Sequence, residues 1–78
     1  MIVFPNPAAS VLNFTFNNPE QPEAYLRFST LTGKLVKQIR WEKEKQTMDV
    51  KVGNLRTGIY LYDLTMDRSK IYGKFIKE

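Results

Sequence analysis

The sequence contains no cysteine and no histidine. Without cysteine, the chain forms no disulfide and offers no thiolate to a metal ion or a substrate. Without histidine, it lacks the side chain that most often serves as a general base or a metal ligand near neutral pH. A nucleophilic site would have to combine a serine or threonine with a lysine or a carboxylate. These two absences argue against most enzyme classes.

The residues that remain for catalysis show no pattern that favours it. Ser10, Ser29 and Ser69 fall in predicted turns or at strand ends, with no distinctive neighbourhood. The 8 Asp and Glu residues are dispersed, whereas a carboxylate metal site needs a cluster. We therefore predict that the chain is not an enzyme and binds no cofactor, metal ion or small-molecule substrate.

The sequence also lacks a long apolar run and a basic cluster. No apolar stretch approaches the roughly 20 residues of a membrane-spanning helix, and the N-terminus lacks the features of a signal peptide. The net charge of +4 comes from basic residues scattered between Arg27 and Lys77, so we predict a solvated surface and no nucleic-acid partner. The 78 residues suffice for a single small domain, and Met1 placed directly before an apolar strand suggests a domain excised from a longer protein.

Apolar and polar residues alternate in short segments separated by turn residues, which is typical of antiparallel strands. No longer stretch has apolar residues at helical spacing. The number and spacing of the segments predict an all-β fold, an Ig-like antiparallel β-sandwich of about seven short strands. The predicted strands are 2–4, 11–16, 24–31, 35–41, 48–52, 59–64 and 70–77.

The segment 59–64 is the most apolar of these strands, and Gly58 suits the corner where the chain enters it. Apolar residues occupy both sides of its alternation, so we predict a central strand that is covered on both faces over its first half. The core residues that the alternation predicts are Leu12, Phe14, Phe16, Leu26, Phe28, Ile39, Val50, Tyr60 and Tyr62.

Proline and glycine mark the predicted turns. Pro5-Asn6-Pro7 ends the first strand in a stiff turn, because each proline fixes its φ angle and lacks an N–H group. Gly33 supplies the positive φ of a tight turn between two strands. Gly73 lies within the last strand, where a glycine indicates a bulge or a close backbone approach. Polar loops are predicted at 17–22 and 42–45.

Trp41 is the sole tryptophan and precedes a charged segment. If exposed, it could stack on a sugar ring together with exposed tyrosines, which would make the chain a carbohydrate-binding module. A tryptophan at such a position is more often a lid on the core. The sequence leaves both interpretations open.

Several motifs, in order along the chain, resemble those of a known family. Val3-Phe4-Pro5-Asn6-Pro7-Ala8 is similar to the YPNPA opening of the type A C-terminal sorting domains of the bacterial type IX secretion system, the Por secretion system sorting domain family. Leu12-Asn13-Phe14 follows as that family's first full strand. Leu31-Thr32-Gly33-Lys34-Leu35-Val36 resembles its (D/N)xxGKxV hairpin. The LxxGxY motif resembles Leu55-Arg56-Thr57-Gly58-Ile59-Tyr60, and the basic-apolar KhhK terminus resembles Lys74-Phe75-Ile76-Lys77.

This resemblance covers residues 3–78, with Phe4 where tyrosine is usual and Glu78 added after Lys77. It implies that one set of motif residues mainly holds the fold: Pro5, Asn6, Pro7, Gly33, Leu55, Gly58 and Tyr60. It also implies an exposed recognition feature on the last strand, for which the candidates are Lys70, Gly73, Lys74 and Lys77.

The resemblance further implies a function as an address tag. Domains of this family lie at the C-terminus of secreted proteins of Bacteroidota, which are Gram-negative. The expected partners are an N-terminal cargo domain, an outer-membrane secretion translocon and a surface sortase that usually cleaves the tag off. The cargo would pass through the periplasm and outer membrane and be secreted or held at the cell surface. The alternative is an Ig-like interaction, adhesion or carbohydrate-binding module of a secreted protein.

Overall fold

The computed structural model describes residues 1–16, 22–43 and 45–78. Within these ranges all regular secondary structure is β-strand, and no helix that could cross a bilayer is found. The predicted all-β class is therefore confirmed. The strands are β1 (Ile2–Phe4), β2 (Val11–Thr15), β3 (Ala24–Thr30), β4 (Leu35–Trp41), β5 (Thr47–Lys51), β6 (Gly58–Thr65) and β7 (Lys70–Lys77).

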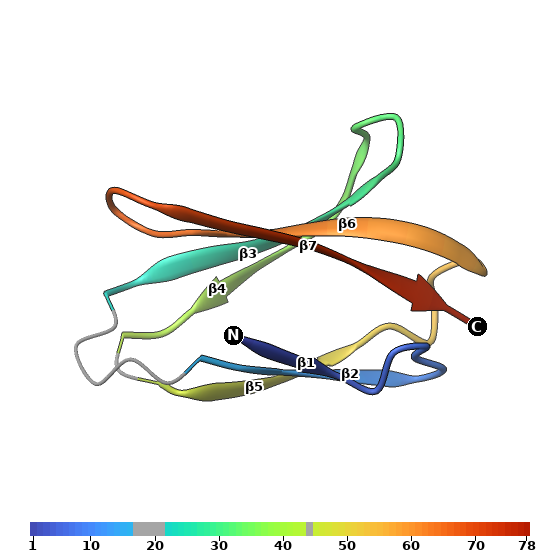
Figure 1. The fold of residues 1–78 in the computed structure, drawn as a ribbon, viewed down its shortest axis with the longest axis horizontal. Coiled ribbons are helices and arrows are strands. Elements are labelled where there is room, and N and C mark those ends of the chain that lie inside the picture. Colours follow the sequence, from blue (N-terminus) through green and yellow to red (C-terminus); the bar gives the residue numbers. More distant parts are fainter. Residues whose placement is uncertain (17–21, 44) are drawn as a thin grey trace.

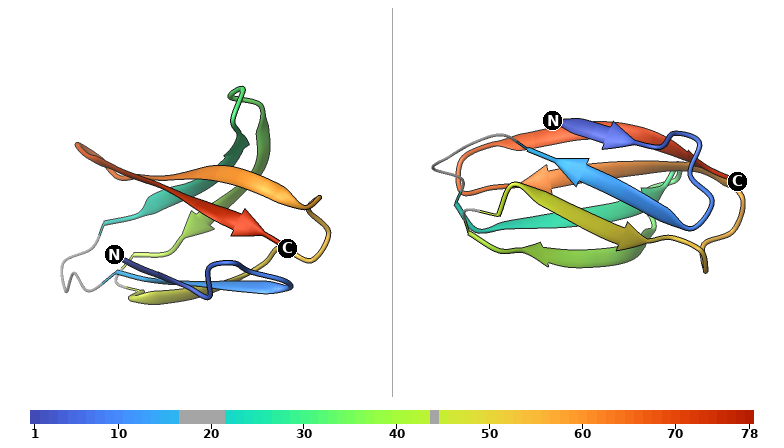
Figure 2. Two further views of the ribbon diagram at one scale, coloured as in Figure 1. Left: turned by 45° about the vertical axis from the view of Figure 1, so that its right-hand side comes forward. Right: turned by 90° about the horizontal axis from the view of Figure 1, so that it is seen from below.

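The strands form two antiparallel sheets that face each other as a sandwich (Figure 1). One sheet has the order β1-β2-β5 and the other the order β4-β3-β6-β7. The chain passes from one sheet to the other after β2, β4 and β5, and the left view in Figure 2 shows both layers. This arrangement confirms the predicted seven-stranded sandwich. Of the predicted loop at 17–22, all but Pro22 lies outside the described residues.

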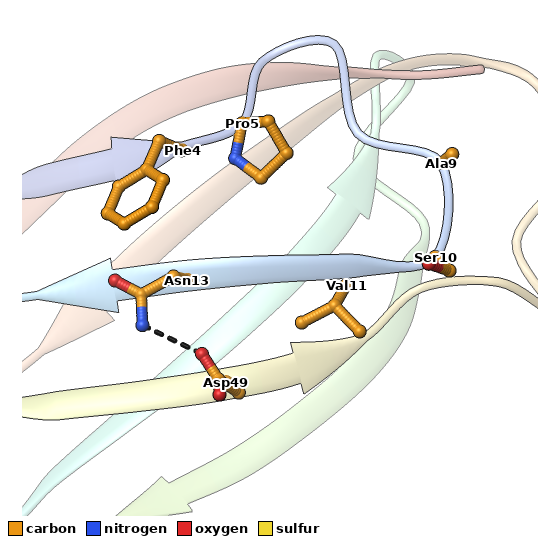
Figure 3. Close-up of a pocket in the computed structure, with 7 residues that line it drawn as sticks. All are labelled: Phe4, Pro5, Ala9, Ser10, Val11, Asn13 and Asp49. Atoms are coloured by element: carbon orange, nitrogen blue, oxygen red, sulfur yellow. Dashed lines mark hydrogen bonds between the residues drawn. The ribbon is translucent and has the colours of Figure 1, made fainter.

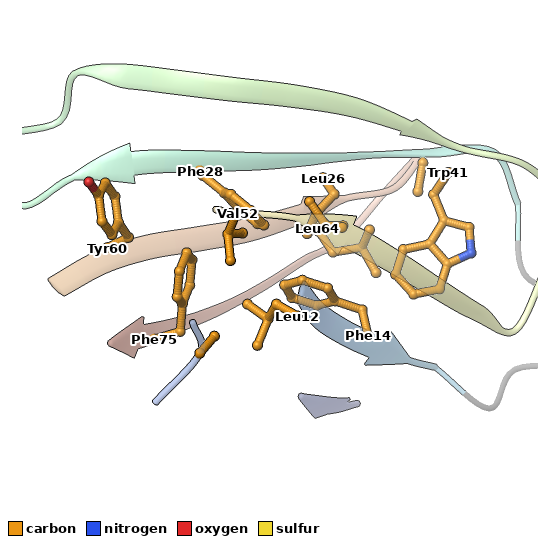
Figure 4. Packing of buried hydrophobic residues seen from close by; sticks show 12 residues of the cluster. Leu12, Phe14, Leu26, Phe28, Trp41, Val52, Tyr60, Leu64 and Phe75 are labelled. Atoms are coloured by element: carbon orange, nitrogen blue, oxygen red, sulfur yellow. The ribbon is translucent and has the colours of Figure 1, made fainter. Parts of the chain in front are cut away.

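The core lies between the two sheets and is built from alternate residues of the strands (Figure 4). Six predicted core residues are buried, while Phe16, Ile39 and Tyr62 are half-buried and pack against the cluster. The prediction missed several further members, some of which lie just outside a strand or at a strand end. The complete buried cluster is Ala8, Leu12, Phe14, Ala24, Leu26, Phe28, Trp41, Val50, Val52, Tyr60, Leu64 and Phe75.

The strand β6 is interior to its sheet, as predicted, but only one of its faces is covered. Ile59 and Leu61, on the outer face, are 46% and 38% exposed. Tyr60 and Leu64, on the inner face, are buried. The prediction that both faces are covered is wrong because a two-layer antiparallel sandwich leaves the outer face of each sheet to the solvent.

Trp41, at the end of β4, is fully buried. Its indole Nε1 donates a hydrogen bond to the backbone carbonyl oxygen of Lys45, so the ring closes one end of the core beneath the charged loop. This position confirms the core-lid interpretation. A buried indole offers no face on which a sugar could stack, so Trp41 does not support the carbohydrate-binding alternative.

The β3–β4 hairpin has the tight turn that the sequence predicts. Gly33 has a φ of 92°, and its N–H donates to the carbonyl oxygen of Thr30 at 2.9 Å. The pairing register shifts between Phe28, opposite Lys37, and Ser29, opposite Leu35. Val36 is therefore the extra residue of a β-bulge.

Gly73 marks a close approach and not a bulge, since the β6–β7 register runs without a shift. A Cβ atom at Gly73 would lie 2.2 Å from the hydroxyl oxygen of Tyr62 and 2.3 Å from its Cζ. The Tyr62 ring also meets Phe14 edge-on, with the ring centroids 5.2 Å apart. Tyr62 therefore lies across the space that β7 leaves free, and burial of the phenol raises its pKa.

The substitution Gly73→Ala should lower the free energy of unfolding by about 1–3 kcal/mol, because the added methyl group displaces the Tyr62 ring from the core. Urea denaturation measures this loss. In a Tyr62→Leu background the same glycine substitution should cost much less, since the conflicting ring atoms are gone. An equal cost in both backgrounds would show that Tyr62 is not the reason for the glycine.

Candidate functional site

The first turn of the chain is joined to its last strand. The N–H of Ile76 donates to the side-chain Oδ1 of Asn6 at 2.9 Å, across 70 positions in the sequence. Ala8 donates its N–H to the carbonyl oxygen of Ile76 at 2.8 Å and accepts the N–H of Glu78 at 2.9 Å. Ala8 thereby forms a parallel bridge with Lys77. We call these three hydrogen bonds between Asn6, Ala8, Ile76 and Glu78 the terminal clasp.

The residue types of the Pro5–Ala8 segment suit this geometry. The peptide bonds that precede Pro5 and Pro7 are both cis. Neither proline has an N–H to donate, so the Asn6 amide side chain and the Ala8 backbone provide the polar contacts. Ala8 is fully buried, and its short side chain lets the two backbones approach. Of the three residues predicted to hold the fold, Asn6 contributes a hydrogen bond to the clasp, and the role of Pro5 and Pro7 stays a prediction.

The segment Leu55–Tyr60 lies at the same end of the sandwich as the clasp. Gly58 pairs with Lys77 across the β6–β7 ladder and has a φ of 157°. Tyr60 stacks on Phe75 with ring centroids 5.5 Å apart, and its hydroxyl donates to the carbonyl oxygen of Arg56 at 2.7 Å. Leu55 is half-buried against the core. The motifs at the start of β6 and the end of β7 therefore share one packing unit with the clasp.

Gly33 also lies at this end of the sandwich, but at the opposite edge of the four-stranded sheet. The register places Thr30 opposite Tyr60 and Tyr60 opposite Phe75, so the β3–β4 turn, the start of β6 and the end of β7 are level with one another. The order β4-β3-β6-β7 separates the turn from the clasp by the width of the sheet. Gly33 is exposed and does not contribute to the clasp.

The candidate recognition residues on β7 do not share a face. Lys70 and Lys74 are exposed on the outer face of the sheet, as expected, and Gly73 is half-buried on the inner face. Lys77 is only 6% exposed, and its Nζ donates to the backbone oxygen of Glu78. The prediction that Lys77 is exposed is wrong because residues 74 and 77 are an odd number of positions apart, and side chains alternate between the faces of a strand. This alternation could have been applied at the sequence level.

A shallow depression lies beside the clasp, on the outer face of the three-stranded sheet (Figure 3). Its polar side is already hydrogen-bonded within the protein: Asn13 donates to Asp49 at 2.7 Å and to Thr47 at 3.0 Å. In the part of the chain that the structure describes, no cluster of three acidic side chains that could hold a metal ion is found. Sequence reasoning missed the depression, which is lined by Phe4, Pro5, Ala9, Ser10, Val11, Asn13 and Asp49.

Fold and clasp together define a small all-β domain whose first and last motifs meet at one end. A protein-family model, described as a secretion system C-terminal sorting domain, matches residues 2–78. The chain therefore belongs to this family, the C-terminal sorting domains of type IX secretion. No curated protein matches the chain, and no solved structure does. Family membership shows that the domain is a sorting signal for export out of the cell and implies that it forms the tail of a cargo protein.

The substitution Asn6→Ala should lower the free energy of unfolding by about 1 kcal/mol, because the N–H of Ile76 loses its acceptor. The Ile76 amide should also exchange with deuterium faster, whereas Asn6→Asp, which keeps an acceptor oxygen, should retain most of its protection. The matched control is Asn54→Ala, since Asn54 is exposed and its side chain makes no hydrogen bond within the described residues. If both alanine variants lose the same free energy of unfolding, the Asn6 hydrogen bond of the clasp does not contribute to stability.

Proposed function

We propose that the folded domain, and not a short linear segment, is the signal that the secretion machinery recognises. The observation that supports this most is the terminal clasp, which joins motifs that lie 70 positions apart in the sequence. A signal assembled from both ends of the chain exists only when the whole sandwich is folded. The domain itself catalyses no reaction. Its role is to present a fixed surface.

In this proposal the partners are an outer-membrane translocon that recognises the domain and a surface sortase that cleaves it from the cargo. The cargo is N-terminal to the domain and reaches the outer membrane from the periplasm. Lys70 and Lys74 are suited to recognition because their side chains extend from the outer face of β7 into the solvent. The inner-face residues Gly73 and Lys77 support the fold.

The first test fuses residues 2–78 to a reporter that has a signal peptide, in a cell with a type IX system. We expect the reporter in the medium or on the surface, whereas a reporter without the domain should stay in the periplasm. A strain without the translocon should retain both. Cell fractionation measures the distribution. If the reporter leaves the cell equally well without the domain, the export function is wrong and an adhesion or interaction module becomes the better proposal.

The second test concerns the recognition surface. Reversing both exposed charges of β7, with Lys70→Glu and Lys74→Glu, should reduce export several-fold while the domain still folds, because both side chains are solvated. The matched control, Lys43→Glu with Lys51→Glu, makes the same change in net charge at exposed residues away from β7. Circular dichroism verifies folding of each variant. Equal export of the two double variants would exclude a specific role for the β7 lysines.

A further inference from the structure

Most of the outer edge of β7 has no hydrogen-bonding neighbour among the residues that the structure describes. β7 is the last strand of its sheet, and the clasp bonds only to Ile76 within it and to Glu78 directly after it. In an antiparallel ladder the backbone groups of alternate residues point to the same side. Since the N–H and carbonyl groups of Ile76 point away from β6, those of Lys70, Tyr72 and Lys74 do so too. Among the described residues, none donates to or accepts from these backbone groups.

The side chains along this edge form a positive surface with an aromatic centre. Lys70 and Lys74 lie opposite Thr65 and Leu61 of β6, which have no charge to offer. Neither lysine takes part in an ion pair within the described part of the chain. Between them, Tyr72 is 71% exposed.

The acidic residue of β6 does not form an ion pair with either lysine. Asp63 is opposite Tyr72 in the ladder, but its Oδ1 accepts from Nε of Arg27 at 3.2 Å on the side away from β7. Within the described residues, the edge thus combines open backbone groups with two lysines that form no ion pair.

We propose that the open edge of β7 binds an extended, acidic segment of a partner protein, which adds to the sheet as a further strand. Its backbone would bond to Lys70, Tyr72 and Lys74, as in other complexes formed by strand addition. Acidic side chains four positions apart in the partner would face the two lysines, because residues opposite each other share a face. A β-branched residue between them would cover Tyr72.

Two observations select this occupant. First, the clasp already bonds to the same edge at its C-terminal end, so an added strand would continue an existing line of hydrogen bonds. Second, the edge is unsuited to a second copy of this chain. The antiparallel register that uses all three open residues would place Lys70 of one copy against Lys74 of the other, and like charges directly opposite each other are destabilising.

This inference deepens the proposed function and rests on it only for the source of the partner, which would be a component of the secretion machinery. The binding mode itself can be measured without export. The probe is a strand of sequence Glu-Val-Thr-Val-Glu, attached after Glu78 by a linker of about eight Gly and Ser residues, which raises its effective concentration at the edge. The probe sequence is symmetric, so it matches β7 in either direction.

We expect the acidic tail to slow deuterium exchange of the Lys70, Tyr72 and Lys74 amides several-fold relative to the chain without a tail, because bonded amides exchange only on opening. The amides of β4, the opposite edge of the sheet, serve as an internal control and should not change. A tail with lysine in place of both glutamates should give no protection. On the Lys70→Glu, Lys74→Glu variant, the lysine tail should protect these amides and the glutamate tail should not.

Two results would overturn the inference: no protection from either tail, or equal protection from both. Dimerisation of the tail-free chain through β7, detected by sedimentation and by the same amides, would assign the edge to a second copy and overturn it as well. Edge protection combined with failed export of the reporter would leave the binding surface standing and reject the proposed function. Export of the reporter without protection of the edge amides would reject the proposed binding surface and leave the proposed function standing.

Discussion

The three hydrogen bonds of the terminal clasp are the constraint on which the arrangement of the two sheets depends at this end. They attach the turn that follows β1, in one sheet, to β7, in the other. Ala8 enters the core at this point, beside the stacked rings of Tyr60 and Phe75. Because the chain has no cysteine, no disulfide joins the two sheets, and at this point backbone and amide hydrogen bonds link them in the folded state.

Beyond the clasp, contacts between aromatic side chains link the rest of the core. Aromatic rings form a chain through it, with Phe28 in contact with both Phe14 and Phe75 at centroid distances of 5.7 and 5.0 Å. Trp41 closes the far end, and Tyr62 occupies the space above Gly73. A domain of this size buries only about 60% of its unfolded surface, so the loss of a single ring or bond is a large part of its stability.

The strands, the turns and much of the core were predictable because the sequence alternates with a period of two and its prolines and glycines stand between the alternating segments. Alternation does not indicate which faces of a sheet a second layer covers, so the prediction that the face of Ile59 and Leu61 is covered was wrong. It also could not reveal the clasp, the Tyr62–Gly73 approach or the depression beside Phe4, since these depend on contacts between distant segments. The burial of Lys77 was within reach of the same alternation, since Lys77 lies two positions after the apolar Phe75 and therefore on the same face of β7.

The joining of both ends has a consequence for biosynthesis. Domains of nascent chains fold progressively from the N-terminus, but here the turn after β1 has no clasp partner until β7 has been synthesised. A chain that stops before the end of β7 therefore lacks the bonds that attach one sheet to the other at this point.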